Sequence, residues 1–286
     1  MFKLKNPVLI ASGIAGFGEE YSKIFDLNLL GGFITKTITL KPKIGNKPPR
    51  ILEIENGLMN SIGLENPGLE IFIKEKLLWL NKNIKIPLIV SIAGDTIDEF
   101  VKIAKILDKQ KGIFGLELNL SCPNIKYKTK CFAQDKEMLY KIVKKVKENT
   151  KLFVIPKLTG IVDDITETSI LAEKAGADAI SLINTIPSLV FLKNNSMFTG
   201  GLSGKCIKPI VLKVIQQVNK NIKIPVIGCG GINDFNDVID FLKTGAKYVA
   251  IGSGLFKNPL LVKEIIMKFN ILKKSFLNYE KNSSGT

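Results

Sequence analysis

The sequence predicts an α/β protein, a closed (β/α)8 or TIM barrel that forms a single domain over residues 1–286, on three observations. Short apolar runs alternate with segments whose apolar residues recur every three to four positions. The runs are apolar on both faces, as parallel strands covered by helices are. The chain length suits one such barrel, and no change in composition marks a second domain.

Eight apolar runs are the expected strands of the barrel. Amphipathic stretches such as IDEFVKIAKILDK and DFNDVIDFLKTG stand between most of them and are the expected helices. Eight strands with helices between them favour a closed barrel over an open sheet. The runs are residues 8–12, 33–36, 87–94, 115–120, 152–158, 179–184, 224–231 and 248–254.

Two segments are too long to be simple connections. Residues 37–70 are rich in Gly, Pro and Asn, and residues 185–208 form a second excursion. Long insertions after barrel strands lie at the carboxyl ends of the strands, where active sites of this architecture are built. We therefore expect both insertions to contribute to a site.

The charged residues and the apolar runs indicate whether the chain binds nucleic acid or a membrane. The formal charge of +15 comes almost entirely from lysines spread along expected helix faces, with Arg50 the only arginine. Specific nucleic-acid recognition favours arginine, so we expect a solvated basic surface and no nucleic-acid partner. No apolar run reaches the roughly 18 residues of a membrane span, so we expect no membrane partner.

Cysteine usage indicates a reduced, cytoplasmic protein. The four cysteines are widely spaced, no CxxC pair occurs and the chain contains no histidine. A structural zinc site is therefore improbable, and we expect no metal site.

Polar residues stand where four of the expected strands end. Lys36, Asn119, Lys157 and Asn184 each occupy such a position. One of them alone would be an ordinary loop residue. Because the strand ends of a barrel converge on one cavity, the four together predict a binding site.

The last two strands end in glycine-rich turns, GCGG at 228–231 and IGSG at 251–254. Glycines of this kind can simply make tight turns. The loops after strands seven and eight of a barrel, however, commonly bind phosphate through backbone N–H groups. No GxGxxG motif occurs in a βαβ context, which argues against a Rossmann dinucleotide site.

The stretch NLSCPN places Cys122 directly after the fourth strand. A cysteine in a cytoplasmic protein is most often buried filling. Beyond a strand end, with Lys36 and Lys157 on the same rim, it could instead be a reactive thiolate. The absence of histidine excludes a Cys/His hydrolytic dyad, which leaves a general acid or base beside a phosphate-anchored cofactor or substrate.

These motifs resemble class 1 dihydroorotate dehydrogenases, the flavin oxidoreductases of pyrimidine (UMP) biosynthesis, over essentially the whole chain. The combination of MNSIGLENPG with LNLSCPN is the specific part of the match. The opening ASGIAGFGEEY and the EKLLWL segment resemble the 1B branch more than the 1A branch. The other matching pieces are TKT, PKL, INT, TGGLSG, IPVIGCGG and IGSG.

The resemblance implies conversion of (S)-dihydroorotate to orotate, with Cys122 removing the C5 proton and FMN accepting the C6 hydride. The implied substrate-binding residues are Lys36, Asn60, Ser61, Ile62, Gly63, Leu64, Asn119, Asn184 and Thr185. The implied FMN-binding residues are Ser12, Lys36, Thr37, Asn119, Lys157, Ile183, Gly204, Gly230, Gly231, Gly252 and Ser253.

The 1B resemblance also implies partners. We expect a homodimer core that docks an electron-transfer subunit, with FAD and a 2Fe–2S cluster on that subunit, passing electrons to NAD⁺. This chain has no spaced cysteines that would hold a cluster itself. Three departures from the 1B pattern concern the loop IKYKTKCFAQD after Cys122, Ser91 in place of an asparagine near the flavin, and a shorter excursion after Asn184.

Alternatives remain open at this point. A 1A-type enzyme would use fumarate without a second subunit. Dihydropyrimidine dehydrogenase and tRNA dihydrouridine synthase are other FMN barrels that act on pyrimidines with a motif cysteine. A phosphate-binding isomerase or synthase of the same fold would have no need of Cys122.

Overall fold

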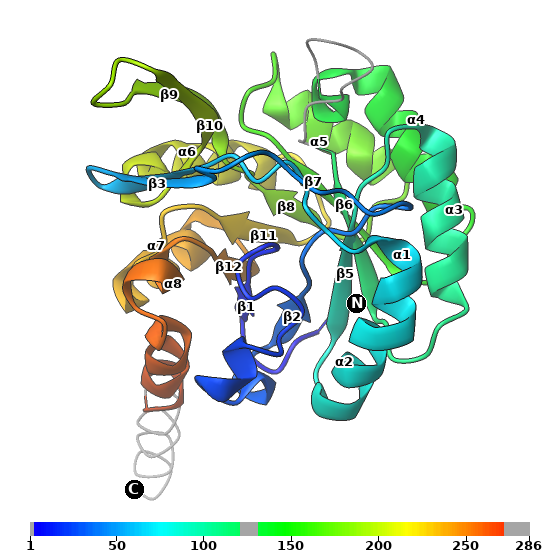
Figure 1. Ribbon diagram of the computed structural model, residues 1–286. Coiled ribbons are helices and arrows are strands. Elements are labelled where there is room, and N and C mark those ends of the chain that lie inside the picture. Colours follow the sequence, from blue (N-terminus) through cyan, green and yellow to red (C-terminus); the bar gives the residue numbers. More distant parts are fainter. Residues whose placement is uncertain (1–2, 121–130, 272–286) are drawn as a thin grey trace, which may run out of the picture.

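The computed structural model describes residues 3–120 and 131–271. Eight parallel strands close into a barrel in the spatial order β1–β12–β11–β8–β7–β6–β5–β2 (Figure 1). Each strand overlaps one of the eight apolar runs, so the expected fold class is confirmed. The strands are β1 (Val8–Ile10), β2 (Gly32–Ile34), β5 (Leu88–Ile92), β6 (Gly115–Asn119), β7 (Phe153–Leu158), β8 (Ile180–Leu182), β11 (Val226–Cys229) and β12 (Tyr248–Ile251).

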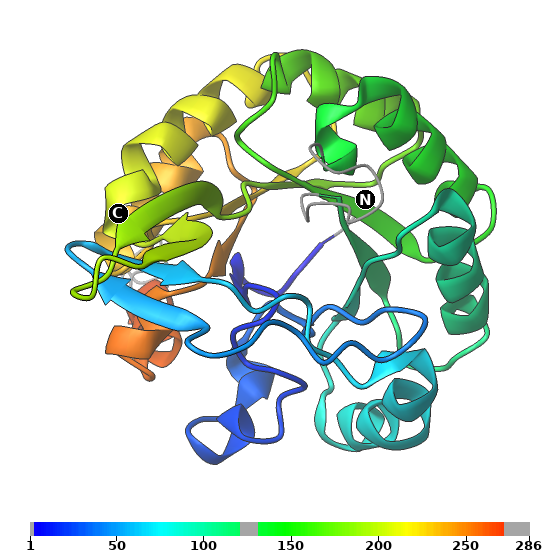
Figure 2. The ribbon, with the colours of Figure 1, turned by 45° about the horizontal axis from the view of Figure 1, so that its top comes forward.

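Helices cover the outside of the barrel. Those from α3 to α6 form the green-to-yellow arc around the strands in Figure 2, and each packs on the next. The long helices are α3 (Ile97–Asp108), α4 (Lys136–Lys147), α5 (Ile165–Lys174), α6 (Lys208–Asn219) and α7 (Phe235–Thr244). The short ones are α1 (Gly68–Ile71), α2 (Leu77–Asn83) and α8 (Gly254–Lys257).

The connection between β1 and β2 departs from the strand–helix alternation. It holds two 3-10 turns, Tyr21–Lys23 and Leu27–Leu29, in place of an α-helix. A π-helical turn over Phe72–Lys76 joins α1 to α2, and two further 3-10 turns lie at Phe132–Gln134 and Lys205–Ile207.

Side-chain caps begin most of the long helices. Thr96 accepts a hydrogen bond from the Glu99 N–H at the start of α3, and Asp135 accepts one from the Met138 N–H at the start of α4. Asp234 caps α7 in a reciprocal pair with Asp237. Such caps satisfy backbone N–H groups that lack partners within the helix, which is why each helix begins where its polar residue stands.

The barrel strands alternate between two apolar clusters. On β6, Leu116 and Leu118 point outward and join the large cluster beneath the helices. Residues such as Ile89, Ile155 and Ile227 form the smaller cluster inside the barrel. Glu117 and Asn119 of β6 share this inward direction, because side chains two apart lie on the same face of a strand.

The two long excursions pair with each other, which the sequence did not indicate. They form an antiparallel sheet in the order β3–β4–β10–β9, beside the mouth of the barrel (Figures 1 and 2). The pairing of β4 with β10 joins residues more than a hundred positions apart, such as Asn60 and Gly201. The strands are β3 (Ile51–Ile54), β4 (Gly57–Asn60), β9 (Ile186–Phe191) and β10 (Met197–Ser203).

Within the described ranges, no helix combines the length and apolarity needed to cross a membrane. Nor do those ranges contain a group of three or more His, Cys, Asp or Glu side chains placed to hold a metal ion.

Replacing Phe100 with alanine tests the packing between α3 and the barrel. Its side chain is fully buried and its ring meets Phe132 edge-on with the centroids 5.9 Å apart. We expect Phe100→Ala to lower the free energy of unfolding by about 3–5 kcal/mol, because the cavity cannot fully collapse. Chemical denaturation followed by circular dichroism measures this. The control is Phe256→Ala, whose side chain is 52% exposed and should change stability little.

Candidate active site

The carboxyl ends of the central strands bring together three of the four strand-end residues. Asn119 lies directly across from Lys157 in the β6–β7 ladder. Asn184 follows β8, and its amide Nδ2 donates to Asn119 Oδ1 at 3.4 Å. Parallel neighbours in register present their side chains to the same face, which here is the barrel interior.

A line of hydrogen bonds continues from these amides down into the barrel, and we call it the polar chain. Asn119 Nδ2 donates to Thr37 Oγ1 at 3.3 Å. The Thr37 and Ser91 hydroxyls are 2.9 Å apart, and Ser91 Oγ donates to Glu117 Oε1 at 3.1 Å. Ser12 lies beside the chain, with its Oγ 3.2 Å from Thr37 Oγ1. Ser91, noted above as a departure, is therefore a buried link of this chain.

Lys157 carries the buried positive charge of the site and is 5% exposed. Burial alone would lower the pKa of this lysine, but its attraction to Glu117, with a smaller contribution from Cys229 in its ionised form, raises the pKa overall. Burial also raises the pKa of the Cys229 thiol, against the opposing pull of Lys157. Cys229 therefore stays neutral near pH 7, and Glu117 is the group that keeps Lys157 protonated.

Lys36 stands at the rim, next to the first excursion. Its Nζ lies 3.4 Å from Glu65 Oε2, a long distance for a charged hydrogen bond. Arg50 Nη1 approaches the same carboxylate oxygen more closely, at 3.0 Å. Glu65 thus keeps a partner when the ammonium group of Lys36 turns toward another anion.

The small antiparallel sheet brings Asn60 next to the residues after β8. Asn60 Nδ2 donates to the carbonyl oxygen of Gly201 at 3.2 Å. A Cβ added at Gly201 would lie 2.0 Å from Thr185 Oγ1 and 3.5 Å from Asn60 Nδ2. Glycine at this position therefore lets the Thr185 hydroxyl and the Asn60 amide approach each other, and Thr185 N in turn donates to Asn184 Oδ1.

The residues after Asn60 make their contacts elsewhere. Asn46 Nδ2 donates to the carbonyl oxygen and hydroxyl of Ser61, and the Asn46 N–H donates to the Ile62 carbonyl. Gly63 and Leu64 both have positive φ, 72° and 55°. These contacts hold the loop 61–64 in a tight turn against Asn46.

The glycine turns lie where the sequence placed them, at the ends of β11 and β12. Gly204, Gly230 and Gly231 all have positive φ, so the backbone conformation itself favours glycine there. A Cβ on Gly231 would also come within 2.9 Å of the Gly204 carbonyl oxygen, which puts the β11 turn in contact with the turn that follows β10. Ile183 is buried beside them and its N–H donates to the Cys229 carbonyl.

Gly252 differs from these glycines. Its φ lies outside the left-handed region, and an added Cβ would meet only Ala11 Cβ, at 3.8 Å. Neither conformation nor packing therefore requires glycine at this position. Open space above a glycine turn, next to Ser253 and on the strand adjacent to the one that ends at Gly230 and Gly231, is what a phosphate cradle needs.

Comparison with known proteins decides the family. A family model described as dihydroorotate dehydrogenase matches residues 1–272. A protein of Thermodesulfovibrio yellowstonii named dihydroorotate dehydrogenase B (NAD(+)), catalytic subunit, is 46% identical over 92% of this chain and 88% of its own. Relatives with the same name from Endomicrobium trichonymphae (45%, covering 90% and 85%) and Malacoplasma penetrans (43%, covering 93% and 88%) are similar. The chain belongs to the dihydroorotate dehydrogenase family.

The residues present fit the FMN that this family implies. Two buried side-chain oxygens, Glu117 Oε2 and Ser181 Oγ, have no hydrogen-bond partner within the described ranges. Both residues belong to the barrel interior with Lys157. The charged Lys157 on β7 suits the ring system of FMN, and the open glycine turns at the ends of β11 and β12 suit its phosphate.

Two parts of the expected dehydrogenase site need separate mention. Cys122, the expected base, lies outside the described residues. Glu117, Glu65 and Ser91 were not identified as site residues from the sequence. A charged residue in the middle of the apolar run GLELNL was the one signal that could have drawn attention to Glu117.

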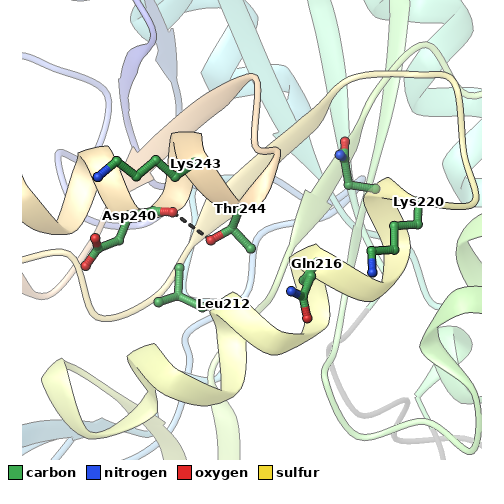
Figure 3. A pocket seen from close by; sticks show the side chains of 7 residues that line it. Leu212, Gln216, Lys220, Asp240, Lys243 and Thr244 are labelled. Carbon is green, nitrogen blue, oxygen red and sulfur yellow. Dashed lines mark hydrogen bonds between the residues drawn. The ribbon is translucent and has the colours of Figure 1, made fainter.

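A hollow of about 440 Å³ lies between α6 and α7 (Figure 3). It is lined by the final turns of both helices, and the Thr244 hydroxyl donates to the Asp240 carbonyl at its edge. Helices of a barrel end near the amino ends of the next strands, at the face opposite the site. This hollow therefore has no part in the dehydrogenase site. Its lining residues are Leu212, Gln216, Asn219, Lys220, Asp240, Lys243 and Thr244.

Replacing Gly252 with alanine separates a binding role from a packing role. We expect Gly252→Ala to leave the melting temperature of the FMN-free protein unchanged, because the methyl group enters open space. The same methyl should weaken FMN binding, measured by fluorescence titration, by about 10-fold or more, as for one lost or blocked phosphate hydrogen bond.

The matched control is Gly228→Ala, where the Cβ would lie 2.4 Å from Phe241 Cδ1 and should lower stability instead. Unchanged FMN affinity in Gly252→Ala would remove this turn from the cofactor site.

Proposed function

We propose that this chain is the FMN-containing catalytic subunit of an NAD⁺-linked dihydroorotate dehydrogenase and oxidises (S)-dihydroorotate to orotate. The observation that carries the proposal is the similarity to relatives of that name along at least 85% of both chains. The strand-end amides, the buried Lys157 and the glycine turns support it, because each suits one part of this chemistry.

Amide side chains hold the pyrimidine ring. The ring of dihydroorotate carries both N–H donors and carbonyl acceptors, and an amide offers both kinds of group in fixed geometry. Asn60, Asn119, Asn184 and the hydroxyl of Thr185 lie together at the mouth of the barrel. The loop 61–64 borders the substrate from the side of the small sheet.

Lys36 neutralises the carboxylate of the substrate. Its ammonium group is only loosely held by Glu65, at 3.4 Å, and Arg50 balances Glu65 when Lys36 moves away. The lysine can therefore exchange one carboxylate for another at little electrostatic cost.

Lys157 supports the cofactor from inside the barrel. FMN, when bound, supplies the acceptor for the hydride that leaves C6 of the substrate. The positive charge of Lys157, which Glu117 maintains, favours the accumulation of negative charge on a flavin bound beside it. Ser12, Lys36, Thr37, Asn119 and Ile183 would border the ring system of FMN, and Gly204, Gly230, Gly231, Gly252 and Ser253 would hold its phosphate.

Cys122 removes the proton from C5. Its thiolate takes the proton as the C5–H electron pair becomes the C5=C6 double bond, and the hydride departs from C6. The proton from C5 and the hydride from C6 are together the two hydrogens that dihydroorotate loses when it becomes orotate. With no histidine in the chain, cysteine is the side chain of this motif suited to act as a base.

A second subunit receives the electrons. The names of the relatives contain both "NAD(+)" and "catalytic subunit", and we extend both features to this chain. FAD and a 2Fe–2S cluster belong to that partner. A homodimer core is supported by the β9–β10 hairpin, where Leu189, Phe191 and Met197 are exposed on one face of the sheet. Apolar surface of this kind is suited to a protein interface.

The function is tested by mixing the FMN-loaded chain with dihydroorotate without oxygen. We expect the flavin absorbance to bleach with formation of orotate, and NAD⁺ to be reduced only after the electron-transfer subunit is added. Dihydrouracil and fumarate serve as controls. A chain that takes up no FMN contradicts the whole proposal, and rapid turnover with fumarate alone identifies a 1A-type enzyme instead.

Cys122→Ala tests the identity of the base. Flavin bleaching should slow by about 10²–10⁴-fold, the usual effect of losing a general base, while FMN stays bound. In the unaltered protein the rate should rise with pH as the thiolate forms, and this dependence should vanish in the variant. Cys206→Ala, at an exposed cysteine, is the matched control. Rates that agree within a few-fold at every pH would rule out Cys122 as the base.

A further inference from the structure

In the reaction as described, Glu117 acts only through the charge of Lys157 and touches no substrate, yet its environment is unusual. It is 1% exposed in the middle of β6, among inward-facing residues of the barrel. One carboxylate oxygen accepts from Ser91, and the other has no hydrogen-bond partner within the described ranges. Burying a carboxylate costs free energy unless the group is paired and hydrogen-bonded, so a buried Glu117 at the lower end of the polar chain is not expected from packing alone.

A carboxylate accepts hydrogen bonds and cannot donate them. Ser91 must therefore give its single proton to Glu117, and Thr37 must give its own to Ser91. The Thr37 oxygen is then left to accept, which it does from Asn119 Nδ2. The direction of every bond in the chain thus follows from the charge at its lower end.

The same constraint reaches the amide of Asn119. An amide has nearly the same shape whichever way its oxygen and nitrogen are arranged, so its neighbours decide the orientation. Because Thr37 accepts, Asn119 turns its nitrogen toward Thr37 and its oxygen toward Asn184 Nδ2. Ser12 does not disturb this order, since its hydroxyl donates to the Thr35 carbonyl at 2.9 Å.

We propose that Glu117 is a positioning residue, whose acceptor-only carboxylate acts through Ser91 and Thr37 to set the orientation of the Asn119 amide and so the pattern of donors and acceptors that the substrate meets. The inference rests on the proposed function, because it concerns the site that binds orotate. Lys157 lies in the same barrel interior and is attracted to Glu117, so one buried pair serves both the cofactor side and the substrate side of the cavity.

Glu117→Gln tests this relay, because glutamine has the same shape but can donate to Ser91. The chain can then run in reverse, and Asn119 turns its oxygen toward Thr37. We expect the dissociation constant for orotate, measured from its perturbation of the FMN spectrum, to rise about 5- to 100-fold, as for mispaired polar groups in a buried site. Ser91→Ala interrupts the same chain and leaves the charge in place, so it should weaken orotate binding similarly.

The double variant Glu117→Gln/Ser91→Ala distinguishes the relay from a merely structural role of the two residues. If both residues act through one chain, combining the substitutions should weaken orotate binding no more than the larger single effect, whereas independent loosening would add. FMN affinity of the Ser91→Ala variant should stay within about three-fold, because this substitution leaves the phosphate cradle and the Glu117–Lys157 charges in place. The matched control is Glu137→Gln on the exposed face of α4, which should leave orotate binding unchanged.

The outcomes separate this inference from the proposed function. Failure of the unaltered protein to bind orotate contradicts the function itself. Normal orotate binding by Glu117→Gln, or additive effects in the double variant, overturns only the relay. Should Glu117→Gln fail to retain FMN, Ser91→Ala alone decides, and orotate binding equal to that of the unaltered protein then overturns the relay.

Discussion

The closed ring of eight parallel strands is the constraint on which the site depends. Closure gives every strand one face toward the barrel interior and brings all the carboxyl ends to the same rim. Asn119, Lys157 and Ser181 lie in one row across β6, β7 and β8 because the register of the ladders aligns them. A shift of one residue in any of these strands would turn its polar side chain outward into the apolar cluster beneath the helices.

The charges inside the ring are stable only as a set. Removing an ammonium group or a carboxylate from water costs several kcal/mol, and attraction between the two offsets this cost only when both are present. Lys157 keeps its proton because Glu117 lies in the same interior, and Glu117 keeps one hydrogen bond through Ser91. Apolar side chains would fill this space at lower cost, so the polar interior reflects the chemistry of the site.

The small antiparallel sheet completes the site from outside the ring. It ties the excursion after β2 to the excursion after β8, and thereby sets Asn60 beside Thr185. The same excursion carries Glu65 and Arg50, which share the charge of Lys36 at the rim. Two segments distant in sequence therefore form one wall of the cavity, and the end of β10 lies next to the glycine turn of β11, where Gly204 approaches Gly231.

The sequence by itself determined the barrel, because apolar runs alternating with amphipathic helices can bury both faces of each strand in few other ways. It also indicated Lys36, Asn119, Lys157 and Asn184, since polar residues that end apolar strands must lie on the rim, and the glycine turns followed from their place after the last two strands. The motif around Cys122 points to a base, and that residue lies outside the described ranges.

Only the tertiary structure decided the rest. The pairing of β4 with β10 depends on contacts between distant segments, which local patterns do not encode. The run GLELNL does not predict the role of Glu117, because the sequence pattern is the same whether an acidic residue in a strand faces solvent, a ligand or a buried lysine. Its meaning comes from Ser91, Thr37 and Lys157, which three other strand regions bring to it. Burial and hydrogen-bond direction arise from those neighbours, and folding alone brings them together.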